Sequence, residues 1–202
     1  MIAPEIARQI MGRNVIGVVE LIPLMSALGR GGVSVEPMVS YSTEQLLKVK
    51  DTHLLILGQN ITIREMRDTF GLDPKQKEPC FYNQDWYIRE SFMDQILSAE
   101  WFLISKEVGQ TTRGQQPDDV IHSGIKLPSA IQSVYAFFAY YCFTEGTEKL
   151  WEYDFVWCCD KDHNGDRIYV GKYTDIRGVN KSGFSIHRNL ALRSWYGAAE
   201  II

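Results

Sequence analysis

The chain has 202 residues, of which 45% are hydrophobic and 23% are charged, so its composition is globular and excludes intrinsic disorder. Its formal net charge is −4, which excludes a protein covered in positive charge for nucleic acid binding. No apolar run reaches the roughly 18 residues that cross a bilayer. Glu5 also stands where a secretory signal carries cations. We therefore expect a single globular domain over residues 1–202 that lies in the cytoplasm and has no membrane partner.

The cysteine content agrees with a reducing compartment. The chain has four cysteines, too few for a disulfide scaffold in a protein of this size. Cys158 and Cys159 are adjacent, and neighbouring side chains of a strand point to opposite faces, so these two are poorly placed to share a metal. We expect free thiols.

The first seventy residues alternate between helical and extended patterns. Apolar residues up to Leu28 predict one or two helices, the second from Val15, that end at the glycine cluster 29–32. Ser42 and Thr62 are each followed three residues later by Gln or Glu, a capping box that predicts a helix start. The apolar run 52–58 between these two helices predicts a buried strand.

The middle of the chain has three distinct patterns. Residues 99–108 have the composition of a strand. The polar stretch 109–119 lacks apolar periodicity and predicts a flexible loop. Pro128 suits a first helical turn, and residues 129–143 predict a helix that is apolar almost all round, which is typical of a central buried helix.

The last third predicts strands. Asn164-Gly165 is the strongest short signal for a tight turn, and it lies between two aromatic-rich runs, so residues 151–173 predict a β-hairpin. Residues 183–190 predict a final strand. The expected fold class is therefore α+β, a mostly antiparallel sheet with a C-terminal hairpin, covered by N-terminal helices and the central buried helix.

The hairpin loop carries oxygen ligands on alternate positions. Asp160, Asp162, Asn164 and Asp166 surround Gly165 in the order of the first half of a calcium loop. This stretch resembles the Asp-x-Asp-x-Asn-Gly loops of several unrelated calcium-binding families over about seven residues. The second half departs from that pattern, since Arg167 and Gly171 replace the apolar residue and the bidentate Glu. The sequence thus predicts either a Ca²⁺ site, closed by a distant ligand such as Asp175, or a solvated acidic turn.

The same acidic residues also fit a catalytic alternative. Asp160 and Asp162, with His163 and His187, could hold Mg²⁺ and position a water for hydrolysis of an anionic substrate. The usual nuclease pattern of an Asp followed by Glu-x-Lys is absent at Lys106 and Lys172.

Two further features suggest ligands. Asp85, Trp86 and Trp195 stand in polar surroundings and could bind a ligand through an aromatic face and a carboxylate. Residues 161–202 carry a net charge of +3 and residues 1–160 a net charge of −7, so this basic C-terminal region could face a protein or an anionic ligand. The function we expect is a non-enzymatic binding or assembly protein with a Ca²⁺-stabilised hairpin loop. The alternative is a metal-dependent hydrolase of the nuclease or phosphoesterase kind.

Overall fold

The computed structural model describes residues 1–31, 35–174, 183–188 and 191–202. The helices, in chain order, are α1 (Pro4–Met11), α2 (Ile22–Ala27), α3 (Thr43–Val49), α4 (Ile63–Phe70), α5 (Pro117–His122) and α6 (Ala130–Phe143). Short 3₁₀ turns are η1 (Gly12–Asn14), η2 (Ser91–Asp94) and η3 (Gln110–Thr112). The strands are β1 (Val15–Ile16), β2 (His53–Leu57), β3 (Trp101–Ser105), β4 (Phe155–Lys161), β5 (Arg167–Gly171), β6 (Ser185–Arg188) and β7 (Tyr196–Gly197).

The described strands form two sheets, and the α+β class is confirmed. The first sheet has the order β1-β2-β3 and the second has the order β6-β5-β4-β7. Neighbouring strands are antiparallel except for β1 with β2 and β4 with β7, which are parallel. Both sheets are therefore mixed, which refines the expected mostly antiparallel sheet.

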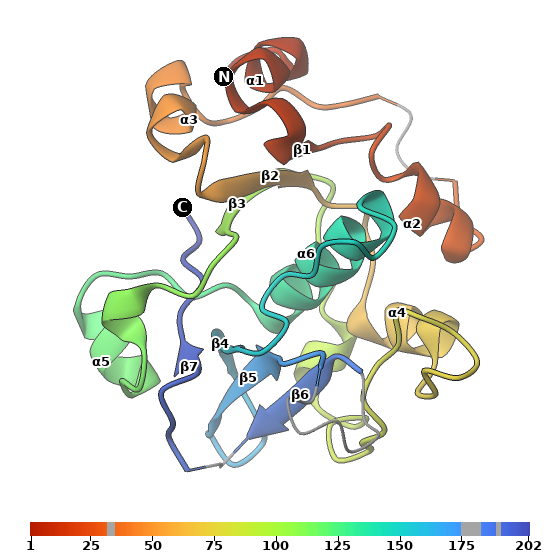
Figure 1. Cartoon of the computed structure of the whole chain (residues 1–202), viewed down its shortest axis with the longest axis vertical. Helices are drawn as coiled ribbons and strands as arrows, with labels where there is room; N and C mark the ends of the chain where they lie inside the picture. The colour runs from red at the N-terminus through yellow and green to blue at the C-terminus, as the bar shows by residue number, and fades with distance from the viewer. Residues whose placement is uncertain (32–34, 175–182, 189–190) are drawn as a thin grey trace.

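Helix α6 lies between the two sheets (Figure 1) and confirms the predicted buried helix. Ten of its fourteen residues are buried, and its rings Phe137 and Phe138 pack against Phe81 and Phe184. The helix begins at Ala130, two residues after Pro128, because Ser129 accepts the backbone N–H of Gln132 and the Gln132 side chain accepts the N–H of Ser129.

The second sheet is covered on both faces. Its inner face packs against α6 in the main core. Its outer face carries four large rings, which pack with Val120 of α5 and with Leu127 and Ala198. We call these four rings the outer aromatic cluster: Phe155, Trp157, Tyr169 and Tyr196. This second small core fixes the position of the hairpin β4–β5.

The C-terminal segment joins the edges of the two sheets. Tyr196 pairs with Phe155 of β4, and Ile201 bridges Ile104 of β3. The Tyr41 hydroxyl donates to the carbonyl of Ile202 at 2.9 Å. The last seven residues thus connect the two sheets.

Two predicted segments differ from the structure. The apolar stretch from Val15 was expected to be helical, but Val15–Ile16 pairs with β2 because its backbone completes the edge of the first sheet. The segment 109–119 was expected to be a loop, but it contains η3 and the start of α5, where Pro117 occupies the first helical turn. Among the described residues, none of the helices has both the length and the apolar character that a bilayer crossing needs.

Candidate functional site

The turn of the acidic hairpin is closed by the side chain of Asp162. Its Oδ1 accepts the backbone N–H groups of Asn164 and Asp166, both at 2.9 Å. Gly165 has a φ of 87°, a left-handed conformation that favours glycine, and its N–H donates to the carbonyl of Asp162. An Asp that binds its own backbone two residues on is a common way to make a turn.

Asp160 points to a different partner. Its Oδ2 accepts the backbone N–H of Ala130 at 2.6 Å, at the start of α6. The pairing of β4 with β5 shifts register between Trp157 and Lys161, which leaves Asp160 outside the regular ladder. Asn164 is exposed at the turn. Asp160 and Asp162 therefore have different partners, and Asp175 lies outside the described residues, so a metal site at the four predicted ligands stays a prediction.

Three charged residues and a histidine fasten the hairpin to the segment before η2. We call them the hairpin clamp: Glu90, Asp162, His163 and Arg188. Glu90 is buried, and it accepts both the backbone N–H of His163 at 2.9 Å and the His163 ring, whose Nδ1 lies 2.6 Å away. Arg188 donates to Oδ2 of Asp162.

The electrostatics of the clamp favour an ionised Asp162. Removal from water raises the pKa of Asp162, but hydrogen bonds from Arg188 and from the backbone of Asp166 and Asn164 outweigh that effect and leave the pKa below its usual value. Buried carboxylates that have such partners hold structure together, and removing one partner is costly.

A divalent cation could contact part of the clamp. One ligand atom each of Glu90, Asp162 and His163 lie within 4.8 Å of one another. The guanidinium of Arg188, however, already binds Asp162 and stands 3.9 Å from Oε1 of Glu90. A cation there would have to displace a positive charge. The three-residue group therefore fits a metal less well than it fits an ion-pair network.

Trp86 and Asp85 lie next to the clamp. The indole N–H of Trp86 donates to the carbonyl of Ile186 at 2.9 Å, and the guanidinium of Arg188 stacks 4.6 Å from the ring centre. Asp85 pairs with Arg67 at 2.7 Å. Trp86 therefore packs against β6, and Arg188 already occupies one face of its ring.

His187 lies apart from the clamp, because neighbouring residues of a strand point to opposite faces. Its ring stacks on Tyr169 and meets the edge of Phe155. Its Nδ1 lies 3.0 Å from the amide nitrogen of Gln84. Burial and the charge of Lys172 lower the pKa of His187 to about 4. The structure thus separates His187 from His163 and Asp162, its predicted catalytic neighbours.

The remaining candidates are scattered. Trp195 packs at the rim of the outer aromatic cluster, where Arg193 stacks on it. Arg167 of the basic C-terminal region pairs with Asp118. Arg177 and Lys181 lie outside the described residues, so an anion at that region stays a prediction.

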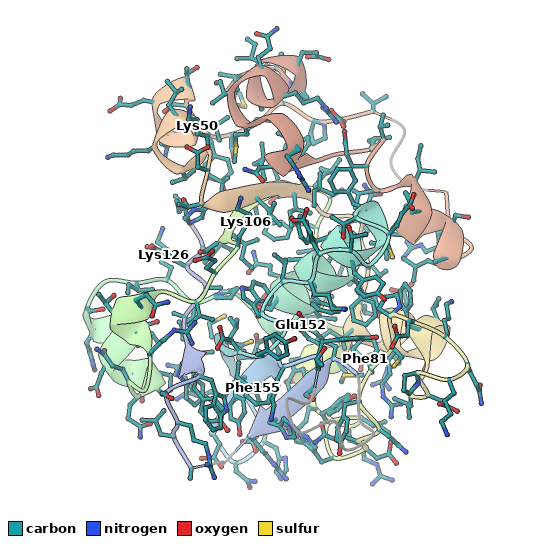
Figure 2. The ribbon with its side chains drawn as sticks, viewed as in Figure 1. Lys50, Phe81, Lys106, Lys126, Glu152 and Phe155 are labelled. Atoms are coloured by element: carbon teal, nitrogen blue, oxygen red, sulfur yellow. The ribbon has the colours of Figure 1, made fainter. Side chains whose placement is uncertain are left out.

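Two adjoining grooves were missed by sequence reasoning. The first has a volume of about 400 Å³ and is lined by residues 106–108 and 148–154 with Arg113 and Tyr140. The second, of about 500 Å³, is lined by residues 9–14 and 50–51. They share a wall of three residues, Lys106, Tyr140 and Glu148. We call the pair the double groove; Figure 2 labels Lys50, Lys106 and Glu152 of its lining.

The lining of the double groove is rich in ion pairs. Arg113 binds both carboxylate oxygens of Asp154 at 2.7 Å, and Lys149 lies 3.5 Å from Glu152. Arg13 and the Tyr140 hydroxyl both donate to Glu148. Burial and the Glu148 carboxylate raise the pKa of Tyr140 to about 12, so its hydroxyl remains a donor at neutral pH.

No sequence motif indicates the double groove. Its walls come from the end of β3, the C-terminal half of α6 and the segment before β4, which only the tertiary fold brings together. Searches with this sequence and structure match no protein-family model, no curated protein and no solved structure. Function must therefore be argued from geometry.

Proposed function

We propose that this chain is a non-enzymatic binding protein that takes a small polar ligand in the double groove, while the acidic hairpin serves as a structural clamp. The observation that carries the proposal is the double groove itself. The volume of each of its two grooves falls within the range of roughly 300–1,000 Å³ typical of ligand sites. Its lining offers donors and acceptors already held in place by ion pairs, so binding would order few side chains.

Backbone strain beside the groove supports the same proposal. Trp151 and Lys172 have φ values of 48° and 45°, which residues other than glycine rarely adopt. The N–H of Lys172 donates to the carbonyl of Trp151 at 3.2 Å, so the two strained residues meet. The buried indole N–H of Trp151 has no hydrogen-bond partner among the described residues. Strain and unsatisfied polar groups concentrate at functional sites.

The partners of the predicted catalytic residues favour binding over hydrolysis. Asp160 binds the start of α6, Asp162 binds its own turn and Arg188, and His187 lies among aromatic rings. A hydrolytic centre needs such groups to converge on one reacting atom. Here Asp160 and His187 each have a separate structural partner, while Asp162 and His163 lie together in the clamp.

Thermal unfolding in the presence of small metabolites tests the proposal, since a ligand that binds only the folded state raises the midpoint. The compounds to be tested are amino acids, nucleotides, sugar phosphates and sugar acids. Glu107→Trp places an indole in the groove from an exposed position, and Glu44→Trp on the exposed face of α3 is its matched control. The proposal predicts that at least one compound raises the midpoint of thermal unfolding, that Glu107→Trp abolishes this rise and that Glu44→Trp preserves it. A shift that both variants keep would place the ligand elsewhere.

The second candidate is a metal-dependent hydrolase that uses the clamp. It is supported by the three ligand atoms within 4.8 Å and by the Glu90–His163 contact, since a carboxylate that orients a histidine is common in metal and catalytic sites. The chromogenic substrate bis(p-nitrophenyl) phosphate with Mg²⁺ or Ca²⁺ tests it. Metal-dependent turnover that His163→Ala removes, with the fold intact, would favour this candidate over the binding protein.

A further inference from the structure

Lys106 is the cation that the two halves of the double groove share. It is half-buried in the wall that both grooves share, and its ammonium donates to Oδ1 of Asn14 at 3.3 Å. Among the described residues, no carboxylate lies within salt-bridge distance of it. Arg13, Arg113 and Lys149 each have an acidic partner, whereas the exposed Lys50 of the second groove, like Lys106, forms no salt bridge within the described part of the chain. An ammonium has three donors, so Lys106 has donors left for an anionic group.

The surroundings of Lys106 limit how much negative charge a ligand can carry. Four carboxylates line the first groove, from Glu107, Glu148, Glu152 and Asp154. A ligand with several phosphates would meet like charges there, which disfavours it. A single anionic group at Lys106 avoids most of that repulsion.

The same carboxylates suit hydroxyl groups. A carboxylate oxygen that already binds a cation keeps lone pairs for a further donor, and the paired Arg113 and Lys149 offer donors beside it. Tyr153, a residue that is 47% exposed, adds an aromatic ring to the lining. An aromatic face next to paired donors and acceptors fits a small ring that has an apolar face and hydroxyl edges.

We infer that the double groove binds a monosaccharide that carries one phosphate or carboxylate group, with the anionic group at Lys106 and the hydroxyls at the Arg113–Asp154 and Lys149–Glu152 pairs. This inference rests on the proposed function, because it names the ligand class of the same groove. It predicts that the ligand needs both its anionic group and its hydroxyl groups for tight binding.

Isothermal titration calorimetry on the full chain tests the inference with four probes: glucose 6-phosphate, glucuronate, glucose and inorganic phosphate. We expect binding of at least one of the two sugar anions, and the sugar that binds identifies the anionic group. Glucose and inorganic phosphate should each bind at least about tenfold more weakly, since each lacks one half of the contacts. Equal affinity for inorganic phosphate or for glucose would overturn the inference.

Three variants locate the anionic group. Lys106→Met should weaken binding of the sugar anion by about 10- to 100-fold, the loss of affinity expected when a hydrogen bond to a charged group is removed. Lys106→Arg should retain most of the affinity, which guards against a merely misfolded Met variant. Lys126→Met, which changes an exposed lysine outside both grooves (Figure 2), should bind like the unaltered chain. Unchanged affinity in Lys106→Met would overturn the inference.

Binding of another kind of compound and the absence of any ligand in the double groove can be told apart. If a compound of another class binds and Glu107→Trp abolishes that binding, the double groove remains a binding site, but the proposal that its ligand is a sugar anion is overturned. Failure of every compound to bind the groove would overturn both.

Discussion

The carboxylate of Asp160 accepts the backbone N–H of Ala130 at 2.6 Å, so the first acidic residue of the hairpin binds the first residue of the buried helix α6. The first backbone N–H groups of a helix have no partner within the helix, and a negative charge there is favourable. Ser129 already binds the N–H of Gln132, and Asp160 satisfies a second donor. Asp160 thus links the hairpin to the centre of the core.

Asp160→Ala should lower the free energy of unfolding by about 1 kcal/mol, the usual effect of losing a side-chain acceptor at a helix start. Asp160→Asn keeps an acceptor and should lose less, since only the charge effect disappears. Urea unfolding followed by circular dichroism measures both. Equal stability of Asp160→Ala and the unaltered chain would contradict this role.

The stability that Asp162 contributes should depend on pH. Its pKa in the folded state is lowered, so the ionised carboxylate stabilises the fold above the unfolded pKa of about 4, and this contribution is lost as pH falls through the folded pKa. The free energies of unfolding of the unaltered chain and of Asp162→Asn should therefore differ most above about pH 5 and converge at lower pH. A difference that stays constant with pH would contradict the pairing with Arg188.

His187 should make the protein less stable in mild acid. Burial and Lys172 lower its pKa from 6.5 to about 4, so between these values the unfolded chain binds the proton that the folded chain refuses. The stability that the neutral His187 contributes is complete above pH 6.5 and is lost as pH falls to about 4. Over this range the free energy of unfolding should change by up to about 1.4 kcal/mol per pH unit. His187→Gln should flatten that slope, whereas His122→Gln, at an exposed position, should not. His53, whose pKa is also lowered by burial, should contribute to the pH dependence that remains, together with Asp162 below about pH 5.

Loss of Glu90 should loosen the hairpin. Glu90→Ala removes the acceptor of the His163 backbone and ring, and we expect a loss of about 2 to 3 kcal/mol, typical of hydrogen bonds to a charged group. Glu90→Gln keeps one acceptor and should lose less. Faster hydrogen exchange of the hairpin amides in Glu90→Ala would accompany the loss. An unchanged exchange rate at His163 would contradict the clamp.

Cys159 should be the first thiol to react with iodoacetamide in the native protein. It is exposed, whereas Cys80 and Cys158 are buried. Burial raises the pKa of Cys80 and of Cys142 to about 11, which keeps both as unreactive thiols. Mass spectrometry should find one rapid modification, absent from Cys159→Ser. Rapid modification of Cys158 would contradict the packing of β4.

Much of the fold could be predicted from local signals. The capping boxes at Ser42 and Thr62 are both present, the strand 52–58 is β2, and Asn164-Gly165 lies in the predicted hairpin turn. These features depend on residues close in sequence, so the sequence alone carries them. Val15–Ile16 was missed because a two-residue strand depends on its partner β2 and not on its own pattern.

The site was harder to predict than the fold. The spacing of Asp160 and Asp162 suggested common ligands, but the register shift in β4 sends Asp160 to α6. Glu90 had no sequence signal, because its partner His163 lies 73 residues further along the chain. The double groove likewise joins Lys106, Tyr140 and Glu148 through tertiary packing alone.

Hydrogen exchange of the full chain, with and without the tightest-binding compound from the thermal screen, tests most directly whether the ligand site is the double groove. The binding-protein account predicts slower exchange of backbone amides in residues 106–113 and 148–154, with little change at the hairpin. Slower exchange confined to residues 83–90 and 160–167 would contradict it, because the ligand would then bind at the clamp.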